Sequence, residues 1–469
     1  MGVSSTALLL STTTILNLVF LTSLASAEFL TPVKDQDDVT LPKMCEEDTV
    51  ISCTLVHIDL DCLNNDTLVF NETTLTFLDQ PGDDSFTFSS SEGDEATFTL
   101  DEEIGAVWGH VELADTRDFI IEPLDLDTCP GCHVLIEEDR SGFPLDHKVA
   151  PPEAAEIRSD PAWAKKVGDL IKKGKTDKTT MVTYTIKIYY TPEVRKSVKN
   201  IATMVENVVA QTNQGYKNSK IPVRVKLHCM EETTVPEAQI SDLGVFNRYK
   251  GGGNNLRGSA DAAALLITHS DQWCGVGYMP PIAADQMTSY PFPKLMTSIT
   301  VTTCAIGSYT FGHEVSHNFG NDPDQYDKTN KIPYAHGYHI PGTKARTIMA
   351  YLRPAKYGAN RHTQEINYYS NPDVKFKNVP TGVEGKADSA RLITEHRFVI
   401  AGVGDESAKC SINVSGGGGG KPTTSAPATT SSAPVTTTAS AAATTTTSDN
   451  YYGGGGNGPD YNGGFVYYG

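Results

Sequence analysis

The chain is 469 residues long, with 39% hydrophobic and 20% charged residues and a formal net charge of −19. This length is too great for a single ordinary domain, and the composition is that of a soluble globular protein with low-complexity additions. The sequence has no basic cluster or aromatic platform of the kind that binds nucleic acid, so we expect no nucleic-acid partner. Two folded units with terminal tails are the organisation that these numbers favour.

The first residues have the pattern of a secretion signal. An apolar run from Ile15 to Leu24 precedes a small-residue tripeptide at 25–27, which predicts a signal peptide over residues 1–27 with cleavage before Glu28. The run is too short to cross a membrane comfortably, and no later segment is apolar enough to do so. We therefore expect a secreted, extracellular protein with no transmembrane segment.

Residues 28–150 alternate apolar and polar residues in short runs, and Gly, Asp and Pro separate the runs. This pattern is typical of short β-strands. The clearest runs are Thr73–Leu78, Ser85–Phe88, Ala96–Leu100 and Val107–Leu113. Residues 28–178 contain 35 Asp and Glu against 12 Lys and Arg, a balance of −23, so the remainder must contribute +4 to reach −19. We predict an acidic, β-rich prodomain over 28–150, which the slightly basic remainder could attract.

Residues 151–178 are rich in Pro, Ala and Lys. They include the pairs Lys165-Lys166 and Lys172-Lys173, which predict an exposed linker with candidate processing sites.

Residues 179–415 alternate between helical and strand patterns. Val182–Tyr190 and Val223–Cys229 alternate as strands, Ala262–Thr268 is a continuously apolar run typical of a buried strand, and Ser298–Thr303 is a further strand candidate. Pro192–Tyr216 has apolar residues at helical spacing. This order predicts an α/β (α+β) fold, with helices packed on a mixed sheet.

The chain after residue 415 has no core-forming pattern. Residues 416–449 start with five glycines and continue as a Thr, Ser, Ala and Pro-rich segment, which predicts a mucin-like stalk. Residues 450–469 are dominated by Gly, Tyr and Asn, and either adhere to the extracellular matrix or form a disordered end without a partner. Sequons at Asn65, Asn71 and Asn413 are consistent with a secreted glycoprotein.

The nine cysteines are expected to form disulfides if the protein is secreted, and their odd number leaves at least one thiol over. Five precede residue 179 and four follow it. If each unit pairs internally, the remaining thiol belongs to the first unit. The cysteines are Cys45, Cys53, Cys62, Cys129, Cys132, Cys229, Cys274, Cys304 and Cys410.

Residues 311–320, Phe-Gly-His-Glu-Val-Ser-His-Asn-Phe-Gly, contain the strongest chemical signal. A helix places His313 and His317 on the same face, where two imidazoles can bind one metal ion such as zinc. Glu314 beside them can accept a proton from an attacking water and return it to a leaving amine. Gly320 follows where the helix must stop and the backbone must turn sharply, which glycine tolerates.

Together with Thr347–Tyr351, this helix resembles the metzincin zinc proteases, with their His-Glu-x-x-His-x-x-Gly helix and Met-turn. Further segments resemble the reprolysin-like, or adamalysin-related, branch, and the resemblance covers roughly residues 180–403. These segments are Cys304–Tyr309, Tyr334–Tyr338, Arg346–Tyr351, Tyr369–Val374 and Ala387–Arg391.

The resemblance implies a metzincin catalytic domain with a twisted mixed sheet, Zn2+ as cofactor and proteins or peptides as substrates. Met349 would form an apolar floor beneath the zinc, and Tyr351 could approach the metal or an oxyanion. A disulfide between Cys274 and Cys304 would tie the segment before the helix to the sheet. An extended substrate would add as a strand to the sheet edge.

The third zinc ligand departs from the family pattern. The family continues Gly-x-x-His-Asp or Gly-x-x-Asp, whereas Pro323, which cannot bind zinc, occupies this position here. Asp324 is our preferred ligand because it lies beyond the turn, and Asp322 is the alternative. It is also open that Asp322, Asp324 and Asp327 only cap a turn or hold calcium, with zinc bound weakly or not at all. His336 and His339 are further candidates, although each alone is more typical of a structural or surface histidine.

The predicted prodomain also contains a resemblance. Pro42–Cys45 resembles the sequence around the inhibitory cysteine of adamalysin propeptides, although Cys45 lies too early in the chain. Cys129 and Cys132 are better placed but are close enough for a local disulfide. We therefore expect an inhibitory prodomain without assigning its switch.

Two functions follow from these observations. The first is a secreted zinc endopeptidase made as a latent precursor, with Glu314 as the general base. The second is a catalytically inactive, metzincin-fold protein of the extracellular matrix or of adhesion, whose stalk and tail do the work. The retained His313, Glu314 and His317 favour the enzyme, and Pro323 favours the inactive protein.

Overall fold

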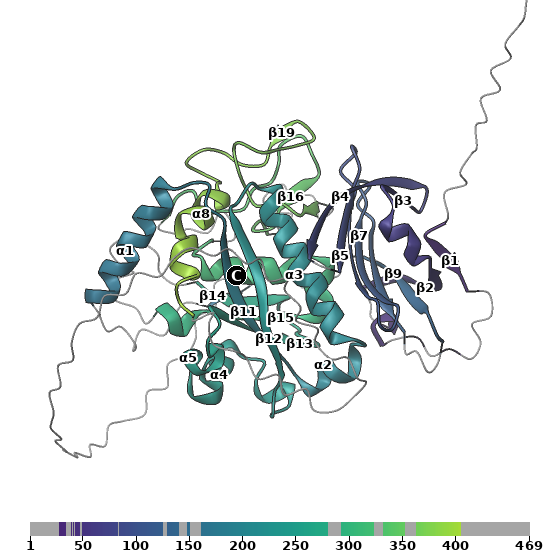
Figure 1. Cartoon of the computed structure of the whole chain (residues 1–469), viewed down its shortest axis with the longest axis horizontal. Helices are drawn as coiled ribbons and strands as arrows, with labels where there is room; N and C mark the ends of the chain where they lie inside the picture. Colours follow the sequence, from purple (N-terminus) through teal and green to yellow (C-terminus); the bar gives the residue numbers. More distant parts are fainter. Residues whose placement is uncertain are drawn as a thin grey trace, which may run out of the picture. The chain divides into compact units, whose positions relative to one another are not determined.

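The computed structural model describes residues 28–33, 39, 41, 43–46, 49–82, 84–124, 129–139, 148–150, 161–279, 292–322, 332–351 and 363–404 (Figure 1). The predicted signal peptide, stalk and tail lie outside these residues, as do Asn413 and Cys410. The described residues belong to one compact unit. Within them, no helix has the length and apolar character needed to cross a membrane.

The N-terminal part of the chain forms a nine-stranded antiparallel sheet in the order β1-β2-β9-β8-β7-β6-β5-β4-β3. Most of these strands are joined to their sequence neighbours, as the closely spaced turn signals require. The strands are β1 (Leu30–Pro32), β2 (Val50–Ile58), β3 (Thr67–Phe70), β4 (Thr73–Gly82), β5 (Ser85–Ser89), β6 (Glu95–Asp101), β7 (Ala106–Glu112), β8 (Asp118–Pro123) and β9 (Cys132–Glu138).

One face of this sheet has its own apolar core. Alternate residues of each strand point to the same side, and here they are mainly aromatic and aliphatic. Phe98 packs edge-to-face against Phe29 and Phe88, with ring centroids 5.0 and 6.1 Å apart. Phe70 packs in the same way on Phe119 at 5.2 Å. The N-terminal sheet therefore buries an apolar layer of its own.

A second, six-stranded sheet has the strand order β10-β14-β15-β13-β11-β12. Its neighbours are parallel, except that β14 runs antiparallel to β15. The strands are β10 (Lys148–Ala150), β11 (Val182–Tyr190), β12 (Val223–Glu232), β13 (Ala262–Ile267), β14 (Gly275–Tyr278) and β15 (Thr297–Val301). Two small ribbons pair β16 (Ala345–Thr347) with β17 (Gln364–Ile366) and β18 (Lys375–Phe376) with β19 (Val379–Pro380).

Helices pack on this mixed sheet, so the predicted fold class is confirmed. Helix α3 contacts β12 and helix α7, which in turn contacts β14 and β15. The α-helices are α1 (Pro161–Thr176), α2 (Pro192–Ser197), α3 (Ile201–Asn218), α4 (Leu243–Arg248), α5 (Gly253–Arg257), α6 (Thr302–Gly307), α7 (Thr310–Asn318) and α8 (Ser389–Ile400).

The single helix expected over Pro192–Tyr216 is two helices. Thr191 caps the start of α2, and Val198 directly after α2 is extended. Asn200 then starts α3 from a left-handed conformation with φ of 48°. An asparagine side chain that bonds the backbone, here to Thr203 N, competes with continuous helix and favours a new N-terminus.

Part of the segment expected to be a linker is helical. Helix α1 packs against α8, and Gly174 lies so close to the Glu395 backbone that a Cβ there would meet the carbonyl oxygen at 2.1 Å. The pairs Lys165-Lys166 and Lys172-Lys173 lie on exposed positions of this helix. Regular backbone hydrogen bonding makes a helix a poorer protease substrate than an open loop.

The cysteines of the N-terminal part are mostly paired. Cys45 is bonded to Cys53, and Cys129 is bonded to Cys132. Cys62 remains a thiol and is 4% exposed within the apolar core of the N-terminal sheet. The cysteine-switch candidates Cys45 and Cys129/Cys132 are therefore disulfide-bonded, and their thiols cannot act as metal ligands in this state.

Candidate active site

Helix α7 carries the three side chains that the sequence singled out. His313, Glu314 and His317 are each fully buried, and ligand atoms from the three lie within 4.8 Å of one another. The two imidazole rings are 4.8 Å apart between centroids, at 75° to each other. The one-turn spacing thus brings both rings to one point beside the carboxylate.

Backbone carbonyls set the orientation of both imidazoles. His313 Nδ1 lies 2.6 Å from the Ile348 carbonyl oxygen, and His317 Nδ1 lies 2.7 Å from that of Asn321. A carbonyl accepts, so each Nδ1 carries a proton, and in the neutral imidazole the Nε2 then keeps its lone pair. Metal-binding histidines use this arrangement, because the second bond fixes the tautomer and the ring orientation.

Burial shifts the pKa values of His317 and Glu314. Burial lowers the pKa of His317 to about 4, against the Asn321 carbonyl, which raises it. His317 is therefore neutral at neutral pH, which is the form that binds a metal ion. Burial also raises the pKa of the Glu314 carboxyl well above its ordinary value. Because the donors are two imidazoles beside a buried carboxyl, a divalent cation such as Zn2+ fits the site.

The turn around Met349 includes Ile348, whose carbonyl oxygen binds His313. Ala350 N donates to Thr347 O at 2.8 Å, which closes the turn, and the Met349 side chain is fully buried in the core. Arg346 Nε donates to Ala350 O at 3.0 Å and pairs with Glu365 at 2.6 Å. This buried ion pair therefore holds the turn that presents Ile348 O to His313.

Tyr351 follows the turn and lies against the first histidine. Its ring stacks on that of His313, with centroids 5.9 Å apart and planes within 9°. His339, an alternative ligand in the sequence analysis, bonds the Tyr351 carbonyl oxygen through Nε2 at 2.9 Å. His336 is 5% exposed, and neither histidine belongs to the His313 group.

Strand β14 lies directly against Glu314. A Cβ on Gly275 would come within 2.5 Å of Glu314 Cγ, and one on Gly277 within 2.5 Å of the Glu314 carbonyl oxygen. Neither glycine was predicted from the sequence as part of the site. Their signal was the Gly-x-Gly pattern beside Cys274, because glycine within a strand marks a close backbone approach. A disulfide joins Cys274 to Cys304 and ties β14 to helix α6.

Strand β10 covers the outer edge of β14. The two strands pair in parallel, with Val149 opposite Gly277. Gly277 is the glycine that packs on Glu314, so the segment before the predicted linker lies one strand away from the base. This sheet edge is where we expected an extended substrate to bind.

The third ligand is not placed. Gly320 has a φ of 97° and ends helix α7, and Asp322 after it is 1% exposed with its N–H bonded to Ala335 O. Among the described residues, the carboxylate of Asp322 does not join the His313 group. Asp324 and Pro323 lie outside the described residues.

A helix that brings two histidines and a carboxyl together, a turn at Met349 and a mixed sheet are the features expected of a metallopeptidase site. Residues 180–369 match the family model of metallo-peptidase family M12, in its reprolysin-like form. This region of the chain is therefore similar to reprolysin-like metallopeptidases, in agreement with the resemblance seen in its sequence.

Curated relatives are also similar to part of the chain. A peptidyl-Asp metalloendopeptidase of Stenotrophomonas maltophilia is 29% identical over 289 residues, which cover 57% of this chain and 63% of that protein. One of Pseudomonas fragi is 33% identical over 104 residues, which cover 22% of this chain and 63% of that protein. The chain thus spans less than two thirds of the length of these relatives.

A solved structure, metalloproteinase-II from Bacteroides fragilis, is similar at 13% identity. The match covers 56% of this chain and 82% of that one, with a TM-score of 0.36. A likeness of this size does not define the fold by itself.

Proposed function

We propose that this chain is a secreted, zinc-dependent endopeptidase made as a latent precursor. The observation that carries the proposal is the buried group His313, Glu314 and His317, in which two backbone carbonyls leave both Nε2 atoms as acceptors. The match to family M12 supports the same reaction class. Secretion is supported by the signal-like N-terminus and by the disulfides, which persist in oxidising compartments.

A bound zinc ion would polarise the scissile carbonyl and make a water molecule more acidic. Glu314 then acts as the base that takes a proton from this water and passes it to the leaving amine. Close packing by Gly275 and Gly277 limits the positions that the carboxylate can adopt. Tyr351, held against His313, is the residue we assign to donate a hydrogen bond to the developing oxyanion.

Latency is supported by strand β10. Main-chain hydrogen bonds at a sheet edge are the usual way to bind an extended peptide, and β10 already occupies the outer edge of β14. A substrate strand and β10 compete for this edge. The N-terminal part would therefore inhibit the site through its backbone, without a cysteine ligand.

The substrate class follows from the relatives. Proteins similar to this chain are named peptidyl-Asp metalloendopeptidases, so we propose that the chain cleaves peptide bonds at aspartate. The test uses two peptides that differ only in Asp against Asn, with the full chain loaded with zinc. We expect the Asp peptide to be cleaved and the Asn peptide to be spared. Equal cleavage of both would reject the aspartate preference alone.

A Glu314→Ala variant tests the mechanism, and Val149→Pro tests latency. We expect no peptide cleavage by the first. The second removes a backbone donor from β10 and should raise the activity of the full chain, whereas Val149→Ala, its matched control, should not. Activity that survives Glu314→Ala would contradict the assigned base.

The competing function is an inactive matrix or adhesion protein with the same fold. It is favoured by Pro323, which replaces the third ligand of the family pattern. A zinc-loaded chain that cleaves neither peptide, even as Val149→Pro, would support this alternative.

A further inference from the structure

The second face of the N-terminal sheet is buried against the catalytic region. Asn207 Nδ2 of helix α3 donates to the carbonyl oxygens of Thr97 and Trp108, both at 3.2 Å. Trp108 is fully buried, and its Nε1 donates to Lys199 O at 3.1 Å. We call this side of the sheet the docking face, and define it by Glu95, Thr97, Thr99, Trp108, Glu112 and Glu122.

Acidic residues lie opposite one another on the docking face. Glu95 of β6 pairs with Glu112 of β7, and Glu112 pairs with Asp118 of β8. Opposed side chains on antiparallel strands lie about 5 Å apart, and like charges there are destabilising. Tyr309, the residue before helix α7, donates its hydroxyl to Glu112 Oε2 at 2.8 Å. His110 lies 2.9 Å from Asp118.

Two side-chain amides of the catalytic region donate hydrogen bonds to Glu95. Its two oxygens accept from Asn367 Nδ2 at 2.7 Å and Asn218 Nδ2 at 2.9 Å. The titratable groups that face it are Tyr368 and the opposed Glu112. Burial of the carboxyl raises the pKa of Glu95 to about 7, although both amide bonds lower it. No cation of the described chain is paired with this carboxylate.

Glu122 is the more deeply buried acid, at 1% exposure. Its two oxygens have no side-chain hydrogen-bond partner among the described residues. Burial raises the pKa of Glu122 to about 8, against the backbone N–H and the charge of Lys199, which lower it. Lys199 is an exposed residue, and burial of the Glu122 carboxyl outweighs its charge.

We propose that the docking face is an acid-stabilised interface: the N-terminal unit binds helix α3 tightly while Glu122 and Glu95 are protonated, and loosens as they ionise at neutral to alkaline pH. The expected pH dependence applies to the contact between the N-terminal sheet and helix α3, whether or not the chain is an active protease.

The direction of the pH effect follows from linkage. Both carboxyls have raised pKa values in the docked state and return to the ordinary range, near 4.5, when exposed to water. Docking is therefore fully favoured below about pH 4.5. It is lost progressively as pH rises through about 7 for Glu95 and about 8 for Glu122.

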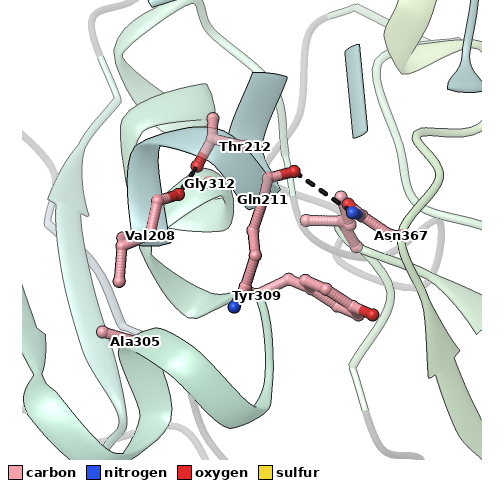
Figure 2. A pocket seen from close by; sticks show the side chains of 8 residues that line it. Val208, Gln211, Thr212, Ala305, Tyr309, Gly312 and Asn367 are labelled. Atoms are coloured by element: carbon pink, nitrogen blue, oxygen red, sulfur yellow. Dashed lines mark hydrogen bonds between the residues drawn. The ribbon is translucent and has the colours of Figure 1, made fainter. Parts of the chain in front are cut away.

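The interface reaches the back of the active-site helix. Figure 2 shows a small pocket lined by residues that include Gln211, Tyr309, Gly312 and Asn367, with Asn367 Nδ2 bonded to Gln211 O. Tyr309 and Asn367 also donate to the acids of the docking face, Glu112 and Glu95. Loosening thus removes contacts from residues that adjoin helix α7.

The experiment measures how often the docking face opens. A Thr97→Cys substitution in a Glu314→Ala full chain places a thiol at a position 2% exposed, and keeps the carbonyl that Asn207 contacts. Its labelling rate by a disulfide reagent is divided by the rate in the denatured chain at each pH. The native thiol Cys62 lies in the apolar core of the same sheet and reports its global opening.

We expect the normalised labelling at position 97 to rise by roughly three orders of magnitude between about pH 5.5 and 8.5, with Cys62 still protected. Glu122→Gln should remove most of this rise and Glu95→Gln a smaller part, because the amide cannot ionise. Glu102→Gln, a solvent-exposed control in the same unit, should leave it unchanged. The proposal would be overturned if Glu122→Gln and Glu95→Gln both left the pH-dependent rise as large as in the chain without them. Labelling of Cys62 together with position 97 would also overturn it.

Discussion

The chain buries polar groups at two places, the active-site helix α7 and the docking face. The two places differ in the kind of positive charge that their buried groups can bind. At α7, backbone carbonyls hold both Nδ1 atoms and leave two Nε2 lone pairs and one carboxylate at one point. At the docking face, amides and a phenol meet carboxyls. The first arrangement is completed by a metal cation and the second by protons, so the two should respond to chelators and to pH independently.

The largest expected effect is on catalysis at α7. Glu314→Ala should lower kcat/KM by about a thousandfold, since a general base contributes about 10² to 10⁴. The variant should retain its zinc, because both imidazoles remain anchored. Peptide kinetics and metal analysis of the same sample check this. Loss of zinc together with activity would show that Glu314 is needed to build the site.

Metal removal should come next in size. Chelation of the zinc-loaded chain should lower the free energy of unfolding by about 3 kcal/mol when zinc had been at about 100 times its Kd. Urea denaturation with and without chelator measures the change. His317→Ala should show no such difference, whereas Glu122→Gln should show the full one. A chelator effect that differs between Glu122→Gln and wild type would mean that the two sites are coupled.

A smaller effect is expected where β14 meets the base. Gly277→Ala forces a Cβ toward the Glu314 carbonyl oxygen, so strand β14 must move. We expect kcat/KM to fall by roughly tenfold to a hundredfold, since small misplacements of catalytic groups are costly. Gly168→Ala on helix α1, where a Cβ meets nothing within 4 Å, is the matched control. Full activity in Gly277→Ala would show that β14 does not position Glu314.

The smallest effect belongs to a single bond of the docking face. Tyr309→Phe removes the hydroxyl that donates a hydrogen bond to Glu112. The loss should lower the free energy of unfolding by about 1–2 kcal/mol. Tyr189→Phe also removes one buried bond, to Leu256 O, but in a different core. Only the Tyr309 variant should increase thiol labelling at position 97. Equal labelling in both variants would remove Tyr309 from the interface.

Much of the fold could be predicted from the sequence because its elements have regular patterns. Strand β11 runs over the predicted Val182–Tyr190, and β13 differs from the prediction by one residue. The break in Pro192–Tyr216 was missed, because apolar spacing continues across it while Asn200 supplies a local alternative. Helix α1 was missed because its lysines suggested an exposed linker, and packing on α8 decides its structure.

The site was less predictable than its motif. Local spacing identified His313, Glu314 and His317, because one helix presents all three. The partners that orient them, Ile348 and Asn321, act through backbone carbonyls and so leave no side-chain signal. The role of Glu122 depends on its burial against the catalytic region. The local sequence of strand β8 does not predict this burial.

The most direct test of the metal site is the zinc content of the purified full chain after loosely held metal is removed. The geometry of His313, Glu314 and His317 predicts about one zinc per chain in the wild type, and none in a His313→Ala, His317→Ala double variant. A wild-type chain that retains no more zinc than the double variant would contradict the metal site, and with it the proposed peptidase.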